Sequence, residues 1–215
     1  MLDITLAGEQ LQLHHEKALY WPARKLLMVA DTHFGKDGIF RQHSIPIPEG
    51  CVTHDLKRLS MLLNETGAER LLVLGDFIHG YLDKAQPFIE QFGQWRSEYS
   101  NVIIDVVLGN HDRRIDKQLY TDINWHEDYC DGPFVFIHEP SKREEGYVLC
   151  GHTHPVMRLT AGRGDALRLP VFWFTDACGT LPSFGSMTGG YAITPDKADR
   201  LYAVGPDAVV PLGQQ

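Results

Sequence analysis

The histidines of this chain are concentrated at the ends of short apolar runs. Six of the 11 lie at or just beyond the end of such a run: His33, His79, His111, His138, His152 and His154. Three of these runs also deliver a carboxylate or an amide, in the segments DTH, GDFIH and GNHD. The runs themselves, such as RLLVLGD, are rich in Leu and Val, as buried strands are. In an open α/β sheet, ligands bind outside the carboxyl ends of the strands, so we expect these side chains to gather on one rim.

Strand and helix signals alternate in the first half of the chain. Residues 3–15 alternate apolar and polar side chains around Gly8, which predicts a hairpin. Strand-like runs follow at 24–33, 70–76 and 101–112, and helical patterns separate them at 53–70, ending near Gly67, and at 85–100. The second half has shorter strand runs at 133–139, 146–154, 167–174 and 189–195. This order predicts an α/β layered fold, and since no linker or repeat interrupts residues 1–215, we expect one domain.

Composition limits the location and the partners of the protein. No apolar run is long enough for a membrane span, and the N-terminus does not resemble a signal peptide, so we expect a cytoplasmic protein with no membrane partner. The 4 cysteines are widely spaced and are expected to be reduced thiols. A net charge of −8 argues against broad, nonspecific nucleic-acid binding. Bound metal ions would add positive charge that a residue count omits.

The side chains at the run ends indicate a metal site. Mixed Asp, His and Asn ligands suit Mn²⁺, Fe²⁺ or Zn²⁺, and the absence of a Cys ligand weakens a structural zinc interpretation. The candidate ligands are Asp31, His33, Asp76, Asn110, His138, His152 and His154. Such a set is too large for one ion but suffices for two if one carboxylate bridges them. The alternative is a purely structural or vestigial cluster.

The order of these motifs resembles the calcineurin-like metallophosphoesterase superfamily. The series D-x-H, G-D, G-N-H-D, H and G-H-x-H stands at 31–33, 75–76, 109–112, 138 and 151–154. The resemblance implies a four-layer α/β/β/α sandwich. It implies that the first ion is held by Asp31, His33 and His154. It implies that the second is held by Asn110, His138 and His152, with Asp76 bridging both.

The resemblance gives the residues beside the ligands other roles. It implies that His111 stands near the leaving group as a general acid or charge stabiliser, held by Asp112. Many relatives read G-D-x-x-D where this chain reads GDFIH, and the resemblance places this fourth position outside the ligand set. We therefore expect His79 to lie just behind the ligands; a satisfied core residue is the alternative. Arg113 and Arg114 follow GNHD and could bind a flanking phosphate; a solvated pair is the alternative.

This constellation supports hydrolysis of a phosphate ester. Two divalent ions flanking one carboxylate can lower the pKa of a bridging water, giving hydroxide near neutral pH. The same ions stabilise the charge that builds on phosphorus during in-line attack. His111 can then assist departure of the leaving group.

The sequence around the motifs is similar to a narrower family, the bacterial ligase-associated metallophosphoesterases, also called PdeM or MPE. The similar segments are residues 19–36, 40–50, 167–174 and 181–191. Members are manganese-dependent phosphodiesterases with DNA endonuclease activity, encoded beside an ATP-dependent DNA ligase and a helicase. The resemblance implies a binuclear phosphodiesterase and endonuclease of DNA repair that acts on DNA, preferably single-stranded, with ligase and helicase as potential partners.

Two other functions compete with this one. The first is a small-molecule phosphatase or nucleotide phosphodiesterase of the same fold, and the second is a noncatalytic scaffold for ligase or helicase partners. Side chains that could line a DNA groove are the basic residues Lys36, Arg41, Arg113 and Arg114. Aromatic side chains that could stack on bases are Trp125, Tyr129, Trp173 and Phe174. The segment VFWF, which holds Trp173 and Phe174, more often forms a core strand than a base platform.

Overall fold

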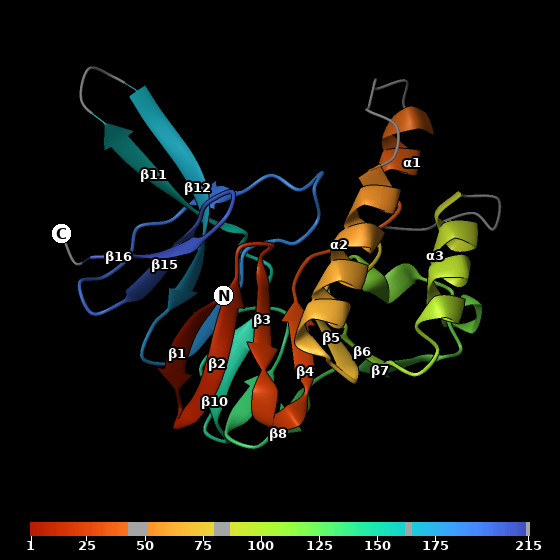
Figure 1. The fold of residues 1–215 in the computed structure, drawn as a ribbon, viewed down its shortest axis with the longest axis horizontal. Helices are drawn as coiled ribbons and strands as arrows, with labels where there is room; N and C mark the ends of the chain where they lie inside the picture. Colours follow the sequence, from red (N-terminus) through yellow and green to blue (C-terminus); the bar gives the residue numbers. More distant parts are fainter. Residues whose placement is uncertain (43–50, 80–86, 162–164, 214–215) are drawn as a thin grey trace.

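The first half of the chain builds one large sheet with helices on one face. The computed structural model describes residues 1–42, 51–79, 87–161 and 165–213 (Figure 1). The first sheet follows chain order: β1 (Leu2–Leu6), β2 (Glu9–His14), β3 (Ala18–Trp21), β4 (Leu26–Val29), β5 (Arg70–Leu74), β6 (Ile103–Val107) and β7 (Ile123–His126). Strands β1 to β4 are antiparallel neighbours, whereas β4 to β7 run parallel. The parallel half therefore directs its carboxyl ends to one edge.

The predicted hairpin around Gly8 is confirmed and begins this sheet. Ala7 and Gly8 form its two-residue turn with φ of 48° and 86°. Positive φ at both central residues is the conformation that matches the twist of paired strands. The alternation of the sequence then directs Leu11 and Leu13 into the interior, where both are fully buried.

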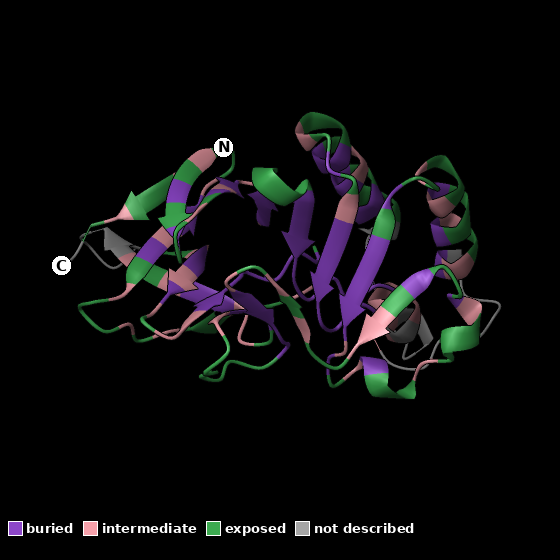
Figure 2. Cartoon of the chain, turned by 90° about the horizontal axis from the view of Figure 1, so that it is seen from below, coloured by how far each residue is buried: buried purple, intermediate pink, exposed green. Residues whose placement is uncertain are grey.

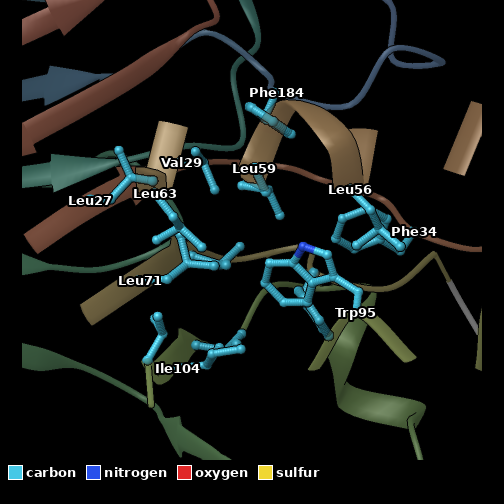
Figure 3. Close-up of a cluster of buried hydrophobic side chains, with 14 of the residues drawn as sticks. Leu27, Val29, Phe34, Leu56, Leu59, Leu63, Leu71, Trp95, Ile104 and Phe184 are labelled. Carbon is cyan, nitrogen blue, oxygen red and sulfur yellow. The ribbon is translucent and has the colours of Figure 1, made fainter. Parts of the chain in front are cut away.

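Three α-helices are found in the described residues: α1 (Lys36–Gln42), α2 (Cys51–Thr66) and α3 (Pro87–Glu98). The predicted helices correspond to α2, which stops before Gly67 as expected, and to α3; residues 80–86 lie outside the described part. The inner face of α2 places Leu56, Leu59 and Leu63 against Leu27 and Leu71 of the sheet (Figure 3). This apolar layer fixes the strands whose ends carry the motifs.

The second half of the chain forms the second sheet. Its strands are β8 (Tyr129–Asp131), β9 (Phe134–Phe136), β10 (Tyr147–Cys150), β11 (Pro155–Ala161), β12 (Asp165–Phe174), β13 (Cys178–Thr180), β14 (Tyr191–Ala192), β15 (Arg200–Val204) and β16 (Val209–Leu212). Their order is β14-β11-β12-β13-β10-β9-β8, with β15 between β12 and β16. Short 3₁₀ helices are η1 (Pro22–Arg24), η2 (Asp112–Arg114) and η3 (Lys117–Leu119). Strands β9 and β10 are parallel, so their carboxyl ends also lie at one edge.

The two sheets pack face to face over a common apolar core. Leu26, Met28 and Leu74 from the first sheet belong to the same buried cluster as Phe136 and Phe172 from the second. Figure 2 shows the buried residues concentrated in the central strands, with the outer faces of the helices exposed. The predicted α/β class with two large sheets is confirmed. The helices, the first sheet and the second sheet form three of the four layers expected from the sequence. On the far face of the second sheet, the described residues form small apolar clusters and place no α-helix there.

Two other expectations concern cysteines and membranes. The described thiols of Cys130, Cys150 and Cys178 are unpaired, as expected. Within the described ranges, no helix has both the length and the apolar character that spanning a bilayer requires.

A buried ion network ties α2 to the loop before β3 and to residue 184. The Arg58 guanidinium donates to Asp55 Oδ1 at 2.9 Å, to the Phe184 carbonyl at 2.8 Å and to the Glu16 carbonyl at 2.9 Å. It also pairs with the Glu16 carboxylate and lies 4.0 Å from the centre of the Phe184 ring. Burial raises the pKa of Glu16, but the hydrogen bond and charge of Arg58 outweigh burial and leave that pKa below its ordinary value. The lowered pKa stabilises the fold above the ordinary Glu pKa, and this contribution is lost as the pH falls through the folded-state value.

We expect Arg58→Ala to destabilise the fold by about 3–5 kcal/mol, because Asp55 and Glu16 keep their charges and lose their partner. For a chain of this size, this corresponds to a fall in Tm of about 10 °C. Thermal unfolding measures the effect. Arg143→Ala is the matched control, since its ion pair with Asp128 is solvent-exposed and contributes at most about 1 kcal/mol. Equal Tm values for the two variants would contradict a structural role for the Arg58 network.

Candidate metal centre

The strand ends of both sheets bring the seven predicted ligands together. Asp31, Asp76 and Asn110 follow β4, β5 and β6 by a few residues each. His138 follows β9, and the pair His152 and His154 follows β10. Two adjoining groups form among them. Their members are Asp31, His33 and His154 in one, and Asp76, Asn110, His138 and His152 in the other.

The first group has the geometry of a cation site. The ligand atoms of Asp31, His33 and His154 all lie within 4.8 Å of one another. His154 Nε2 is 3.4 Å from Asp31 Oδ1. The Nε2 atoms of His33 and His154 are buried and have no hydrogen-bond partner among the described residues. Buried nitrogen atoms of this kind normally have a partner, and a divalent ion would provide one here.

The second group is equally compact. His138 Nε2 lies 3.1 Å from Asn110 Oδ1 and 3.0 Å from His152 Nδ1. The other ring nitrogen, His138 Nδ1, lies 3.1 Å from the Leu74 carbonyl oxygen, which can only accept. Nδ1 therefore carries a proton, which leaves Nε2 as the nitrogen that faces the group, as in metal-binding histidines.

Asp76 lies between the two groups. Its Oδ2 is 3.7 Å from His33 Nε2 on one side and 3.6 Å from His138 Nε2 on the other. Its Oδ1 accepts a hydrogen bond from the backbone N–H of His111 at 3.0 Å. One carboxylate therefore faces both groups, which is the placement expected of a bridging ligand.

The backbone is strained where the ligands stand. Eight non-glycine residues of the described chain have positive φ, and five of them belong to the predicted ligand set. These five are Asp31 (52°), His33 (46°), Asp76 (48°), His152 (67°) and His154 (48°). Such conformations cost about 1–3 kcal/mol each and persist where the surroundings enforce them, chiefly at functional sites.

Hydrogen bonds between the motif loops enforce these conformations. The N–H of His33 donates to the Asp76 carbonyl at 2.8 Å, which joins the DTH loop to the GD loop. The N–H of His152 donates to both carboxylate oxygens of Asp31 at 3.1 and 3.0 Å, which joins the GHTH loop to the DTH loop. Each loop therefore positions another.

Burial keeps His33 neutral. Desolvation, followed by the nearby charges of His79 and Lys36, lowers the pKa of His33 to about 2. A neutral imidazole has a free lone pair for an ion. The donor types, the burial and the unpartnered nitrogens all fit a divalent cation.

His79 lies directly behind His33, as expected from the sequence. The two Nδ1 atoms are 3.1 Å apart, so one of these nitrogens donates to the other. If the Nε2 lone pair of His33 serves an ion, then Nδ1 of His33 carries the proton and donates it to His79. The ring of His79 also stacks on His111, with centroids 4.4 Å apart, and burial lowers its pKa to about 4.

The structure gives Asp112 a different partner from the expected one. Its Oδ2 accepts from the N–H groups of Gly109 at 2.9 Å and Phe77 at 3.2 Å, and its Oδ1 accepts from the N–H of Ile78 at 3.0 Å. No hydrogen bond joins it to the His111 ring in the described structure. Consecutive side chains in this turn point apart, so Asp112 is fully buried while His111 remains half-exposed. Asp112 therefore holds the GNHD loop against the loop after β5, and it positions His111 only through the backbone.

The predicted base-stacking residues are buried or packed against other parts of the fold. Phe174 is buried between the sheets. Trp173 donates from Nε1 to Asp199, and Tyr129 accepts from Arg70 and packs on Phe136. Trp125 is half-buried and packs against the helix-side core. The alternative for VFWF, a core strand, is confirmed by Phe174, and the expectation that these four aromatic side chains stack on bases is not supported by their packing.

The basic residues occupy different sides of the centre. Arg113 and Arg114 are exposed on η2, and Arg113 lines a 300 Å³ cavity together with Asn110 and His138. Lys36 begins α1 and is half-buried, and burial lowers its pKa. The side chain of Arg41 lies outside the part of the structure that is described.

A second cavity opens directly over the two groups. Its volume is about 420 Å³, and its lining includes Asp76, His111, His152 and His154. Tyr191 also lines it, a residue that the motif search did not single out. Two packed sheets whose strand ends converge on adjoining Asp/His groups form the arrangement of a metallophosphoesterase.

Comparison with solved structures identifies the family. The nuclease MPE of Pseudomonas putida is 38% identical, with a TM-score of 0.84 over 98% of this chain and 99% of that one. The chain therefore belongs to the family of that nuclease, within the metallophosphoesterases, a class of metal-dependent hydrolytic enzymes.

Two further solved structures are less similar to this chain. Yfce, a phosphoesterase of E. coli, is 15% identical, with a TM-score of 0.43 over 88% of this chain and 93% of that one. The protein AQ665 of Aquifex aeolicus, of unknown function, is 19% identical, with a TM-score of 0.41 over 59% of this chain and 77% of that one. Neither likeness is close enough to support an argument. No protein-family model and no curated protein matches the chain.

Proposed function

We propose that this chain is a manganese-dependent phosphodiesterase that cleaves DNA, preferably single-stranded. We further propose that it serves DNA repair in the cytoplasm, alongside an ATP-dependent DNA ligase and a helicase. The family relationship supports the nuclease activity, since the relative of known structure is a nuclease. The sequence resemblance to ligase-associated enzymes supports the manganese and the partners.

The observation that carries this proposal is the position of Asp76. Its Oδ2 lies at nearly equal distances from His33 of the first group and His138 of the second, 3.7 and 3.6 Å. We assign Asp31, His33 and His154 to the first ion. We assign Asn110, His138 and His152 to the second, with Asp76 shared.

Two divalent ions, when bound, supply an activated water and positive charge for the phosphate oxygens. The residues of the chain supply the geometry. The interlocked loops hold the ligands in place before the substrate binds, which avoids reorganisation during the reaction. His111 extends from the same rim, with Nε2 4.0 Å from Asp76 Oδ2, and its half-exposed ring faces the cavity where the leaving group departs. We assign it the transfer of a proton to the leaving oxygen.

We expect His111→Ala to lower kcat for DNA by about 10²–10⁴-fold, the usual contribution of a general acid. The loss on a p-nitrophenyl diester should be much smaller, because that leaving group departs without a proton. Steady-state kinetics on both substrates measures the difference, and bound manganese is quantified in parallel to establish that the centre is intact. Equal losses on both substrates, with both ions retained, would rule out proton transfer by His111.

A substrate panel tests the proposed function as a whole. The manganese-loaded protein is assayed with a p-nitrophenyl monoester, a bis-p-nitrophenyl diester, a cyclic nucleotide, and single- and double-stranded DNA. We expect hydrolysis of the diester and cleavage of single-stranded DNA. Hydrolysis of the monoester alone would favour a small-molecule phosphatase, and cleavage of the cyclic nucleotide alone a nucleotide phosphodiesterase. No hydrolysis with Mn²⁺, Fe²⁺ or Zn²⁺ would favour a noncatalytic scaffold.

A further inference from the structure

Tyr191 is an exposed aromatic side chain at the rim of the metal centre. Its exposed fraction is 70%, the largest among the exposed large hydrophobic residues of the described chain. Its ring centroid lies 6.4 Å from that of His154, and it lines the same 420 Å³ cavity as Asp76 and His111. No hydrogen-bond partner for its hydroxyl occurs in the described part of the chain. The side chain therefore contributes little to the fold.

The backbone beneath this side chain is firmly held. Strand β14 pairs with β11, where Tyr191 lies opposite Pro155, and the Tyr191 N–H donates to the His154 carbonyl at 3.0 Å. A Cβ on Gly190 would lie 2.1 Å from Val156 Cγ2, so only glycine allows this close approach. The backbone of Tyr191 is thus hydrogen-bonded to that of His154, a predicted ligand, and this fixes where the Tyr191 side chain leaves the chain beside the cavity.

The chemistry at this place favours an unpaired nucleobase. A planar ring beside a phosphodiester centre offers a stacking surface, and stacking serves every base because each has a π-face. Bases inside a duplex already stack on their neighbours and are not available. The chain has a net charge of −8, so backbone phosphates gain little from its overall field. Stacking can supply the affinity that charge does not.

We propose that Tyr191 forms a nucleobase subsite of the metal centre, in which its ring stacks on the unpaired base next to the phosphate to be cleaved. This inference rests on the proposed nuclease function. In this proposal, Tyr191 on the β14–β11 edge of the cavity is the side chain that causes the preference for single-stranded DNA. The exposed Arg113 lies beyond Asn110, in the adjoining 300 Å³ cavity, where the strand would continue.

The test compares two polymers with the same backbone. Manganese-loaded protein is assayed with an oligothymidylate and with an oligomer of abasic tetrahydrofuran nucleotides of the same length. We expect wild-type protein to prefer the oligothymidylate. Tyr191→Ala should reduce that preference, measured as the ratio of the two kcat/KM values, by roughly 5- to 100-fold, the effect of losing one stacked base. Tyr191→Phe keeps the ring and should keep the preference.

A second readout separates stacking from a structural effect. A single abasic position is moved along the oligothymidylate, and the cleavage rate is recorded for wild type and for Tyr191→Ala. In the wild-type protein, the cleavage rate should fall when the abasic position coincides with the stacked base. In Tyr191→Ala, the same abasic position should leave the cleavage rate unchanged, because the base has already lost its partner and the two effects are not additive. Leu167 is another exposed apolar residue, on β12 outside the cavity, so Leu167→Ala is the matched control and should keep the wild-type ratio.

The outcomes distinguish this inference from the proposed function. Equal losses on both polymers, or no loss in Tyr191→Ala, would overturn the subsite while leaving the nuclease intact. If wild-type protein hydrolyses a small diester but neither polymer, the nuclease proposal itself fails.

Discussion

We expect the Asp76→Asn variant to hydrolyse DNA and small diesters about 10³-fold more slowly than wild type, or slower still. This loss equals or exceeds the loss in kcat that follows removal of one group that stabilises charge in the transition state. The amide replaces the carboxylate that faces both His33 and His138. In the proposed centre both ions would lose a charged ligand, so we expect bound manganese to fall from two per chain to one or none. Kinetics and elemental analysis of the same preparation measure the two effects together.

Asparagine is the sharper substitution here, because it changes the charge with little change in shape. Asp76 has φ of 48°, a conformation that asparagine adopts more readily than alanine. The amide oxygen can still accept from the His111 N–H, so the metal-free variant should unfold at nearly the wild-type temperature. Asp122→Asn, a half-exposed carboxylate paired with Arg96, is the matched control and should hydrolyse at the wild-type rate. Retention of two ions and full activity in Asp76→Asn would refute a shared carboxylate.

The second large effect is expected from Gly109→Ala, which adds one methyl group in the GNHD loop. The new Cβ would lie 2.2 Å from Asp76 Oδ1 and 2.3 Å from Asp76 N, inside van der Waals contact of both atoms. Because one of these atoms is backbone, rotation of a side chain cannot relieve the overlap. We expect a loss of stability of about 1–3 kcal/mol, typical of overpacking. A ligand displaced by about 1 Å can lower the rate about 10²-fold.

Gly93→Ala provides the control for this substitution. Gly93 lies within α3, and a Cβ there would have no heavy atom within 4 Å. Alanine in a helix is more stable than glycine by about 0.5–1 kcal/mol, so this variant should unfold at a slightly higher temperature and keep full activity. Thermal unfolding and kcat are measured on both variants. Wild-type activity in Gly109→Ala would contradict the close approach of the two loops.

The predicted metal site could be located from sequence because its residues follow local signals. Each of Asp31, Asp76 and Asn110 comes just after a buried apolar run, and parallel strands bring their carboxyl ends to one edge. The helical pattern before Gly67 and the hairpin at Gly8 are similarly local. At the strand ends, the helix and the hairpin, the periodicity of the sequence predicts the same local structure that the fold contains.

Other features depend on contacts between distant segments, and the sequence did not reveal them. Tyr191 reaches the cavity because β14 pairs with β11, a pairing set by tertiary packing. Asp112 was expected to hold the adjacent His111, but the turn directs its carboxylate to amides at Phe77 and Ile78. Helix α1 was not predicted, since its seven residues include Gly38 and are too few to show a helical period.

Anomalous diffraction from crystals of the manganese-loaded protein tests the central claim most directly. Two peaks are predicted about 3.5–4 Å apart, as in other two-metal centres, with Asp76 contacting both. One peak should lie among Asp31, His33 and His154, and the other among Asn110, His138 and His152. A single peak would contradict the assignment of a binuclear centre to this chain, and two peaks that do not share Asp76 would contradict the bridging role of that carboxylate.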